Sequence, residues 1–397
     1  MNKKPVTGMR DILPNEMEIR AYLLNLIRTT YKSFGYTEIE TPIVESIENL
    51  QGKQGGENEK LIFKIMKRGE KFNLETAKEE NDLADSGLRY DLTLPLARYY
   101  ALHQQELPKP FKALQIGPVF RAERPQKGRF REFYQCDIDV FGDASNLCET
   151  ELILAMMTVL KRIGFKNVVI RVNDRKLLKE IAGKTGLSED LYEDVFIALD
   201  KMDKIGEEGV ASELVKLGME EEDAKAFLAE FATVTVPENL QEIFDLVNSA
   251  KDGDYEVVFD PTLVRGMGYY TGPIFEVAVP EFGSSVGGGG RYDEMVGKFV
   301  GQNTTACGFS IGFERIVGIL LENGFTLPDG KEKTVFLLER GLSKEKRAAA
   351  LKDAALLRAE GKQVLVANMI KNKKFQKEQL NAEGYQDIRE FYENPLN

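Results

Sequence analysis

The chain has almost no histidine, little cysteine and no long apolar run, and each shortage argues against a class of function. His103 is the only histidine in 397 residues, which argues against a Ser-His-Asp hydrolase and a histidine-rich metal site. Proton transfer then has to run through carboxylates, tyrosines, the substrate or water. Cys136, Cys148 and Cys307 are few and far apart. They form neither a disulfide framework nor a zinc ligand set, so we expect a reducing, cytoplasmic environment.

Membrane and export signals are missing as well. No apolar run approaches the roughly 18 residues of a membrane span, and the stretch MNKKPVTGMRDILPNEM has neither the apolar region nor the cleavage site of a signal peptide. Positive charge is in deficit, with 53 Lys and Arg against 64 Asp and Glu and a formal net charge of −11. This balance argues against wholesale non-specific binding of nucleic acid. The length is sufficient for two or three domains of ordinary globular composition.

Against this acidic background, the stretch from Gly117 to Gly142, GPVFRAERPQKGRFREFYQCDIDVFG, concentrates positive charge. Within eleven residues it carries Arg121, Arg124, Lys127, Arg129 and Arg131. Strand-like segments flank these cations, the second with a polar-apolar alternation from Phe133 to Phe141, and Pro125 and Gly128 mark a turn between them. The pattern predicts a β-hairpin with a cationic loop, which suits a polyphosphate and a nucleic-acid end. A solvated charge run is the alternative, and the acidic background argues against it.

Helical and strand periodicities divide the chain into a core, an insertion within that core, and a C-terminal domain. Residues 1–325 mix strands and helices, which predicts an α+β core with a mixed, mainly antiparallel sheet. We expect short strands at 61–65 and 71–74 within it. Residues 174–252 are helical, acidic and nearly without strand signals, so they form a predicted helical insertion. Residues 331–397 carry a β-α-β-α order, which predicts a small parallel α/β domain.

Four further segments place polar residues or glycines where a packed core does not need them. RYDLTLP at 89–95 sets a carboxylate and a hydroxyl at the entrance to a helix, where a simple cap is an equally good interpretation. VRGMGYYTG at 264–272 presents Arg265 beside glycines that allow close backbone approach. SVGGGGRYD at 285–293 predicts a glycine-rich turn, but not a phosphate-binding P-loop. GFSIGFER at 308–315 places an arginine at the start of a helix.

Together and in this order, these segments resemble the catalytic core of class II aminoacyl-tRNA synthetases, most closely the histidyl-tRNA synthetases. The resemblance covers about residues 5–325. Residues 34–42 are similar to motif 1, the dimer-interface element, 117–142 to motif 2, and 308–315 to motif 3. RGMGYYTG and GGGGRYD are the histidine-specific parts. The implied fold is a class II synthetase-like sheet with a helical insertion and a shortened anticodon-binding-like domain.

The resemblance also implies an activity and its residues. Histidine would be activated with ATP and Mg²⁺ to histidyl-adenylate and transferred to the 3′ end of tRNA(His) by a homodimer. Arg121 and Arg265 would be catalytic. ATP would contact Arg121, Glu123, Arg129 and Arg315. Histidine would contact Asp91, Thr93, Gln135, Asp139, Arg265, Tyr269 and Tyr270. The tRNA acceptor end would meet Arg124 and Gln126, and no protein side chains are expected to form a separate metal site.

This chemistry gives a physical reason for the residue types. The histidine carboxylate must attack the α-phosphorus of ATP, so two anions have to be brought together. Arginines on opposite sides cancel their repulsion and stabilise the charge of the transition state. A buried Asp139 facing an imidazole would reject analogues without ring N–H groups, because they leave its carboxylate unpaired.

Two departures from the family pattern keep an alternative open. Gly268 stands where the family commonly has aspartate, and the C-terminal domain looks short, which puts anticodon recognition in doubt. The same fold serves as the regulatory subunit of ATP phosphoribosyltransferase, a non-catalytic paralogue that binds histidine. Retention of Arg121, Arg265 and Arg315 favours the synthetase. A generic nucleic-acid-binding module would not need the predicted histidine pocket, and the insertion is expected to clamp the acceptor stem.

Overall fold

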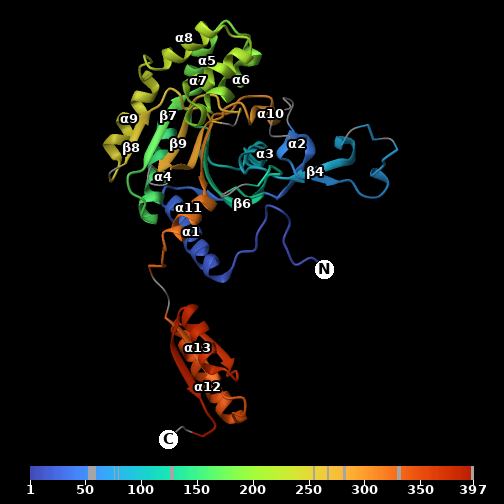
Figure 1. Cartoon of the computed structure of the whole chain (residues 1–397), viewed down its shortest axis with the longest axis vertical. Coiled ribbons are helices and arrows are strands. Elements are labelled where there is room, and N and C mark those ends of the chain that lie inside the picture. The colour runs from blue at the N-terminus through green and yellow to red at the C-terminus, as the bar shows by residue number, and fades with distance from the viewer. Residues whose placement is uncertain are drawn as a thin grey trace. The chain divides into compact units, whose positions relative to one another are not determined.

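The computed structural model describes residues 1–51, 60–75, 77–78, 80–125, 129–253, 255–265, 268–279, 283–328 and 332–394. They divide into two compact units (Figure 1). The first consists of Met1–Ile12 and Arg20–Asn323, and the second of Leu13–Ile19 and Gly324–Asn397. In the part of the chain so described, no helix is both long and apolar enough to cross a membrane.

An eight-stranded sheet forms the centre of the first unit, in the order β1-β5-β6-β11-β10-β9-β7-β8. Its strands are β1 (Thr37–Glu38), β5 (Phe111–Phe120), β6 (Glu132–Phe141), β7 (Val169–Asp174), β8 (Glu256–Phe259), β9 (Pro273–Val279), β10 (Ser284–Arg291) and β11 (Ala306–Gly312). Pairs from β5 through β7 are antiparallel, whereas β1 and β8 add to the two edges in parallel. The predicted mixed, mainly antiparallel sheet is confirmed.

Long helices bury apolar faces around this sheet. They are α1 (Pro14–Ser33), α3 (Thr93–His103), α4 (Leu147–Ile163) and α11 (Phe313–Glu322), with a short α10 (Gly297–Val300). Helix α4 buries Leu152, Met156 and Leu160 at helical spacing and ends at Gly164, whose φ of 105° is left-handed. Tyr31 of α1 is fully buried and its hydroxyl meets the Met156 sulfur at 3.9 Å. These contacts fix two helices that support the sheet.

A small antiparallel sheet flanks the core, formed by β2 (Val44–Ser46), β4 (Ala84–Leu88) and β3 (Lys64–Met66) with α2 (Ile47–Gln51). The strand predicted at 61–65 begins later, because the Leu61 carbonyl accepts from Ala122 of the hairpin instead. The strand predicted at 71–74 is wrong. Gly69 has a φ of 62° and opens a 3₁₀ turn, Gly69–Lys71, in its place. A second 3₁₀ turn covers Glu80–Leu83.

The predicted helical insertion is also confirmed (Figure 1). It contains α5 (Arg175–Gly183), α6 (Tyr192–Leu199), α7 (Met202–Lys216), α8 (Glu221–Phe231) and α9 (Glu238–Ala250), with a 3₁₀ turn at Glu189–Leu191. Asp174 ends β7 and caps α5, because its carboxylate accepts from the Lys176 N–H at 2.8 Å. The apolar faces of α5, α6, α7 and α8 join one core cluster, which includes Phe196, Leu214 and Phe227.

The second unit contains a three-stranded parallel sheet in the order β13-β12-β14. Its elements are β12 (Lys333–Leu338), α12 (Lys344–Ala359), β13 (Gln363–Asn368), α13 (Lys373–Ala382) and β14 (Tyr385–Phe391). The α/β prediction is confirmed, but β14 was missed. Asp387 and Arg389 pair with each other on this edge strand, and their charges conceal the strand pattern in the sequence.

Candidate active site

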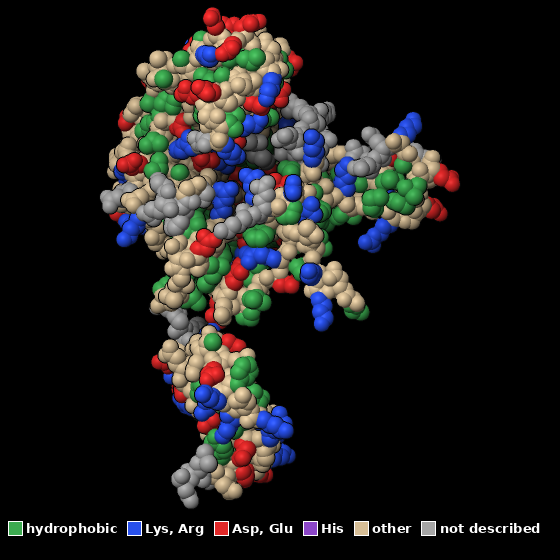
Figure 2. Space-filling view, in the orientation of Figure 1, with side chains coloured by type: hydrophobic (Ala, Val, Ile, Leu, Met, Phe, Trp, Pro, Cys, Tyr) green, Lys and Arg blue, Asp and Glu red, His purple; other side chains and the backbone are tan. Residues whose placement is uncertain are grey.

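A cavity of about 690 Å³ opens in the first unit, over β6, β10 and β11. Figure 2 shows this unit hollowed, with Lys and Arg side chains gathered near the opening. Eleven of the thirteen predicted site residues line the cavity: Asp91, Thr93, Arg121, Glu123, Arg129, Gln135, Asp139, Arg265, Tyr269, Tyr270 and Arg315. Arg124 lies exposed on the hairpin. Gln126 lies outside the described residues.

Strand β6 supplies the polar floor of the cavity. Side chains alternate across a strand, so Gln135, Asp137 and Asp139 share one face, and all three line the cavity. Ser310 of β11 stands opposite Asp137, and Gly308 stands opposite Asp139. Sequence reasoning missed Asp137, although the alternation that it noted over 133–141 contained the signal.

Asp139 is buried, and only one of its two carboxylate oxygens has a hydrogen-bond partner. Its Oδ1 accepts from the Tyr292 hydroxyl at 2.5 Å, while its Oδ2 is buried without a partner. Burial raises the pKa of Asp139 to about 7, against the opposing effect of the Tyr292 hydrogen bond and with the help of nearby Asp91. Tyr292 was also missed. Tyr270 is 8% exposed and Tyr269 contacts both other tyrosines, with ring centroids 4.8 Å from Tyr270 and 5.9 Å from Tyr292.

Asp91 combines the two roles that the sequence left open. Its Oδ1 accepts from the Leu94 N–H at 3.1 Å, which caps the first turn of α3. Its Oδ2 is buried without a partner and belongs to a residue that lines the cavity. Burial raises the pKa of the carboxyl, although the Leu94 hydrogen bond and Arg121 oppose the shift. The cap therefore fixes one oxygen and leaves the other for a ligand.

Arginines form the cationic part of the lining. Arg121 donates to the Tyr90 carbonyl at 3.1 Å and lies over the Phe133 ring at 5.1 Å. Arg315 donates to the Ser285 carbonyl. Burial lowers the pKa of Arg315, and the charges of Arg129 and Arg265 lower it further. Several positive charges therefore lie close together in the lining, an arrangement that favours an anionic ligand.

Arg265 lies between the Glu276 carboxylate and the glycine backbone of β10. Its Nη1 donates to Glu276 Oε2 of β9 at 2.7 Å, while its Nε is buried without a partner. Its guanidinium lies over Gly288 of β10, where a Cβ would come within 2.6 Å of Cζ. Glu276 was not among the predicted residues, and no signal in its sequence neighbourhood marks it.

The four glycines, 287–290, form part of β10, so the predicted glycine turn is wrong. They pair with β9 on one side and β11 on the other. A Cβ on Gly289 would lie 1.9 Å from the Gly308 carbonyl oxygen, and one on Gly290 would lie 2.6 Å from that of Pro273. Neighbouring backbone and Arg265 leave no room for side chains on this strand.

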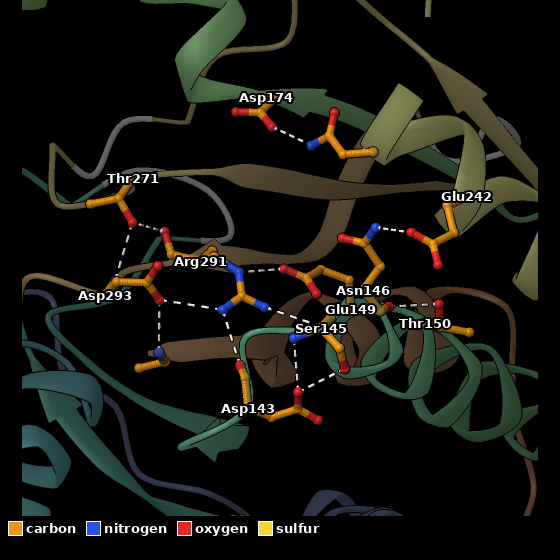
Figure 3. Close-up of polar contacts among 12 residues, drawn as sticks. Asp143, Ser145, Asn146, Glu149, Thr150, Asp174, Glu242, Thr271, Arg291 and Asp293 are labelled. Carbon is orange, nitrogen blue, oxygen red and sulfur yellow. Dashed lines mark hydrogen bonds and ion pairs between the residues drawn. The ribbon is translucent and has the colours of Figure 1, made fainter. Parts of the chain in front are cut away.

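A buried ion pair anchors the end of the glycine strand (Figure 3). Arg291 donates to Glu149 Oε1 of α4 at 2.6 Å and to the Asp143 carbonyl at 3.1 Å. Asp293 accepts from the Ala306 N–H at 2.8 Å, and its own N–H donates to Thr271 Oγ1 at 3.1 Å. The network thus fixes both neighbours of Tyr292 and the residue after Tyr270. Sequence reasoning missed it, because the pair joins residues 142 positions apart.

The insertion places a carboxylate beside Gly268. A Cβ on Gly268 would lie 3.4 Å from Glu193 Oε2 of α6. Glu193 pairs at 2.6 Å with Arg175, whose side chain is 2% exposed. The position that lacks the family's usual aspartate therefore has a carboxylate supplied by another element.

The comparisons with known proteins point to one family. A family model described as histidyl-tRNA synthetase matches residues 8–316. The curated histidine–tRNA ligase of Leifsonia xyli subsp. xyli is 42% identical, over 97% of this chain and 94% of its own length. The crystal structure of histidyl-tRNA synthetase from Nostoc sp. PCC 7120 is similar with a TM-score of 0.78 and 29% identity, covering 97% of this chain and 90% of that one.

A further structure shares the fold. It is described as an ATP phosphoribosyltransferase regulatory subunit/histidyl-tRNA synthetase from Bacillus halodurans C, with a TM-score of 0.76, 22% identity and 98% of both chains covered. At that identity the similarity concerns architecture and not activity. The Leifsonia and Nostoc proteins are more similar to this chain in sequence, and both are named for the same aminoacylation reaction.

Proposed function

The chain belongs to the histidyl-tRNA synthetase family, and on this premise we propose which residues of the cavity carry each step. The enzyme is a histidine–tRNA ligase: it activates histidine with ATP and transfers the histidyl group to tRNA. What remains to assign is the role of each side chain in the lining.

One observation carries the assignment. Within a single cavity, Arg121, Arg265 and Arg315 provide positive charge, while Asp91 Oδ2 and Asp139 Oδ2 are buried acceptors without donors. An isolated buried carboxylate oxygen is costly unless a donor reaches it. The cavity therefore suits a pair of ligands that together are anionic at one end and rich in N–H donors at the other, as ATP and histidine are.

In the proposed activation step, Arg121 and Arg265 hold the α-phosphate and the histidine carboxylate from opposite sides. The carboxylate oxygen attacks the α-phosphorus, the bond to the bridging oxygen breaks, and pyrophosphate leaves with that electron pair. Arg315 and Arg129 hold the outer phosphates, and Glu123 lies near the adenine. Protein contacts already hold Arg121, Arg265 and Arg315, so little reorganisation of these three side chains is needed at the transition state.

In the proposed histidine pocket, the α-ammonium group donates to Asp91 Oδ2, with Thr93 and Gln135 beside it. The imidazole lies between Asp139 and Tyr270. Tyr292 already occupies Oδ1 of Asp139, so Oδ2 accepts from the ring. Tyr269 closes the aromatic wall. A side chain without ring N–H groups would leave Asp139 Oδ2 unpaired, which gives the site its selectivity.

Magnesium fits this site as a companion of ATP. Among the described residues, no group of three or more His, Cys, Asp or Glu side chains could hold a metal ion. Mg²⁺ needs few protein ligands when phosphates supply oxygens, and Glu276, which contacts Arg265 at 2.7 Å, would provide a carboxylate there. When bound, the ion neutralises phosphate charge.

The same proposal includes the macromolecular partners. Arg124, which is exposed, and Gln126 would meet the acceptor end of tRNA(His). The chain would form a homodimer through the element resembling motif 1, and the enzyme would act in the cytoplasm. The catalytic core is proposed to span 1–325 with its insertion at 174–252, and the C-terminal domain 331–397. The regulatory-subunit alternative is not favoured, because the arginines needed for ATP line the cavity.

Pyrophosphate exchange with ATP and each of the twenty amino acids tests the assignment, followed by charging of purified tRNA. Histidine-dependent exchange with charging is the expected result. Arg265→Gln should lower the exchange rate by a factor of about 10²–10³ without abolishing histidine binding. Histidine binding without any exchange by the wild-type protein would refute the proposed roles and favour the regulatory alternative.

A further inference from the structure

A chain of hydrogen bonds runs along the floor of the cavity. Gln135 Nε2 donates to Ser310 Oγ at 3.0 Å, and Ser310 Oγ donates to Asp137 Oδ1 at 2.5 Å. Ser310 and Asp137 are register partners on β11 and β6, and Gln135 lies two residues before Asp137 on the same face. The chain is therefore built into the pairing of two central strands.

These hydrogen bonds fix the orientation of the Gln135 amide. Asp137 Oδ1 accepts a hydrogen bond from the Ser310 hydroxyl. The lone pairs of that hydroxyl oxygen can then accept from the Gln135 NH₂ group. The amide oxygen of Gln135, Oε1, does not take part in this chain of hydrogen bonds and is buried without a partner. Asp91 Oδ2 is a second free acceptor on a residue that lines the same cavity. Two free acceptors match an ammonium group, which only donates.

We propose that Ser310 and Asp137 are positioning residues for the substrate's amino group: they lock the Gln135 amide so that its carbonyl oxygen accepts from the α-ammonium. The inference deepens the proposed function and rests on it, since it requires histidine in this cavity. A reversed amide would aim two N–H donors at a cation. The lock thus makes the site selective for an α-amino group over analogues that lack one.

Ser310→Ala removes the lock and leaves Gln135 in place. We expect the KM for histidine in pyrophosphate exchange to rise about tenfold, because a hydrogen bond to a charged group is lost. The KM for ATP and kcat should change less than about twofold. Ser310→Thr keeps the hydroxyl and should stay near wild type. Ser212→Ala serves as control, because the exposed Ser212 hydroxyl donates to the Glu208 carbonyl one turn earlier in α7.

A double-mutant cycle separates orientation from packing. In Gln135→Glu both terminal atoms are oxygens, so an acceptor faces the cavity in either orientation. Ser310→Ala on that background should then cost less than about twofold. Equal losses in both backgrounds, or an unchanged histidine KM in Ser310→Ala alone, would overturn the proposal.

Two remaining outcomes are also decisive. If Gln135→Glu abolishes histidine binding, Ser310→Thr is the deciding variant. A histidine KM raised as much as in Ser310→Ala would overturn the proposal, and a wild-type histidine KM would support it. If the wild-type enzyme shows no histidine-dependent exchange, the proposed function itself fails and the inference falls with it. A wild-type enzyme that exchanges normally beside an unaffected Ser310→Ala variant refutes the inference alone.

Discussion

The guanidinium of Arg265 occupies the space that a side chain on Gly288 would need: a Cβ there would lie 2.6 Å from Cζ. Glu276 holds the same guanidinium from β9 at 2.7 Å. The glycine backbone beneath the guanidinium and the Glu276 carboxylate beside it fix its position, which in our proposal is where it meets the phosphate. Activity should therefore depend on a residue that has no side chain.

Gly288→Ala should lower activity much more than stability. The obstructing atoms belong to the end of a flexible side chain, so the fold can adjust by moving Arg265, and kcat for exchange should fall at least about tenfold. Gly289→Ala meets the Gly308 carbonyl at 1.9 Å instead, and should lower the free energy of unfolding by more than about 2 kcal/mol. Exchange kinetics and guanidinium denaturation of both variants measure this.

A matched control for the pair is Gly318→Ala on α11, where a Cβ would meet nothing within 4 Å. It should leave exchange unchanged and raise the unfolding free energy by about 0.5–1 kcal/mol, as alanine does in helices. Wild-type kcat in Gly288→Ala would show that Arg265 does not need this surface.

Arg315→Lys should weaken ATP binding selectively. Lysine keeps the charge but loses the fork of donors with which Arg315 holds the Ser285 carbonyl and, in our proposal, the outer phosphate. We expect the KM for ATP to rise about tenfold while the KM for histidine stays within about twofold. Equal increases in both constants would contradict separate ATP and histidine contacts.

Asp139 should make stability depend on pH in a defined direction. Its pKa is raised from 3.8 in the unfolded chain to about 7 in the fold. The folded state therefore binds the extra proton in this window, and stability falls as pH rises from about 4 to 7. In the ligand-free enzyme, Asp139→Asn removes this loss. Its unfolding free energy relative to wild type should rise by about 1 kcal/mol per pH unit between about 5 and 7.

Denaturant titrations of Asp139→Asn and wild type at pH 5, 6, 7 and 8 give that difference directly, because both proteins share every other titrating group. The gap should level off above pH 7, where Asp139 is ionised in both states. A difference that does not vary with pH would mean that Asp139 is already ionised at pH 5.

Glu149→Gln should destabilise the fold strongly. The side chain of Glu149 is fully buried and that of its partner Arg291 is 9% exposed. The change removes the closer counter-charge of a buried cation and leaves Asp293, which is 30% exposed and 3.3 Å away. We expect a loss of about 3–5 kcal/mol in urea unfolding. Glu151→Gln, on the same helix, breaks a more exposed pair with Lys112, with side chains 36% and 21% exposed. It should cost less than about 1 kcal/mol. Similar losses in both would exclude a special role for the buried pair.

The sequence predicted those features that one segment determines by itself. Alternation along 133–141 gave β6, and local motifs gave the eleven residues that the structure gathers around one cavity. The sequence did not predict features that depend on contacts between segments far apart in the chain. The glycines of β10 extend because β9 and β11 pair with them, and the Glu149–Arg291 pair joins a helix to a strand end. Tyr292 acquires its role from Asp139, 153 residues away.

Three oxygens on residues of the cavity lining, Asp91, Gln135 and Asp139, are buried without donors, and this has a consequence for the lifetime of the enzyme itself. In the proposed site, the N–H groups of histidine complete these hydrogen bonds, so that bound histidine acts as a missing side chain of the protein. Its concentration adds to folding stability by RT ln(1 + [L]/Kd), which is about 2.7 kcal/mol at a hundredfold excess over Kd. A cell short of histidine would thus hold this enzyme in its least durable form at the moment when it has least to charge.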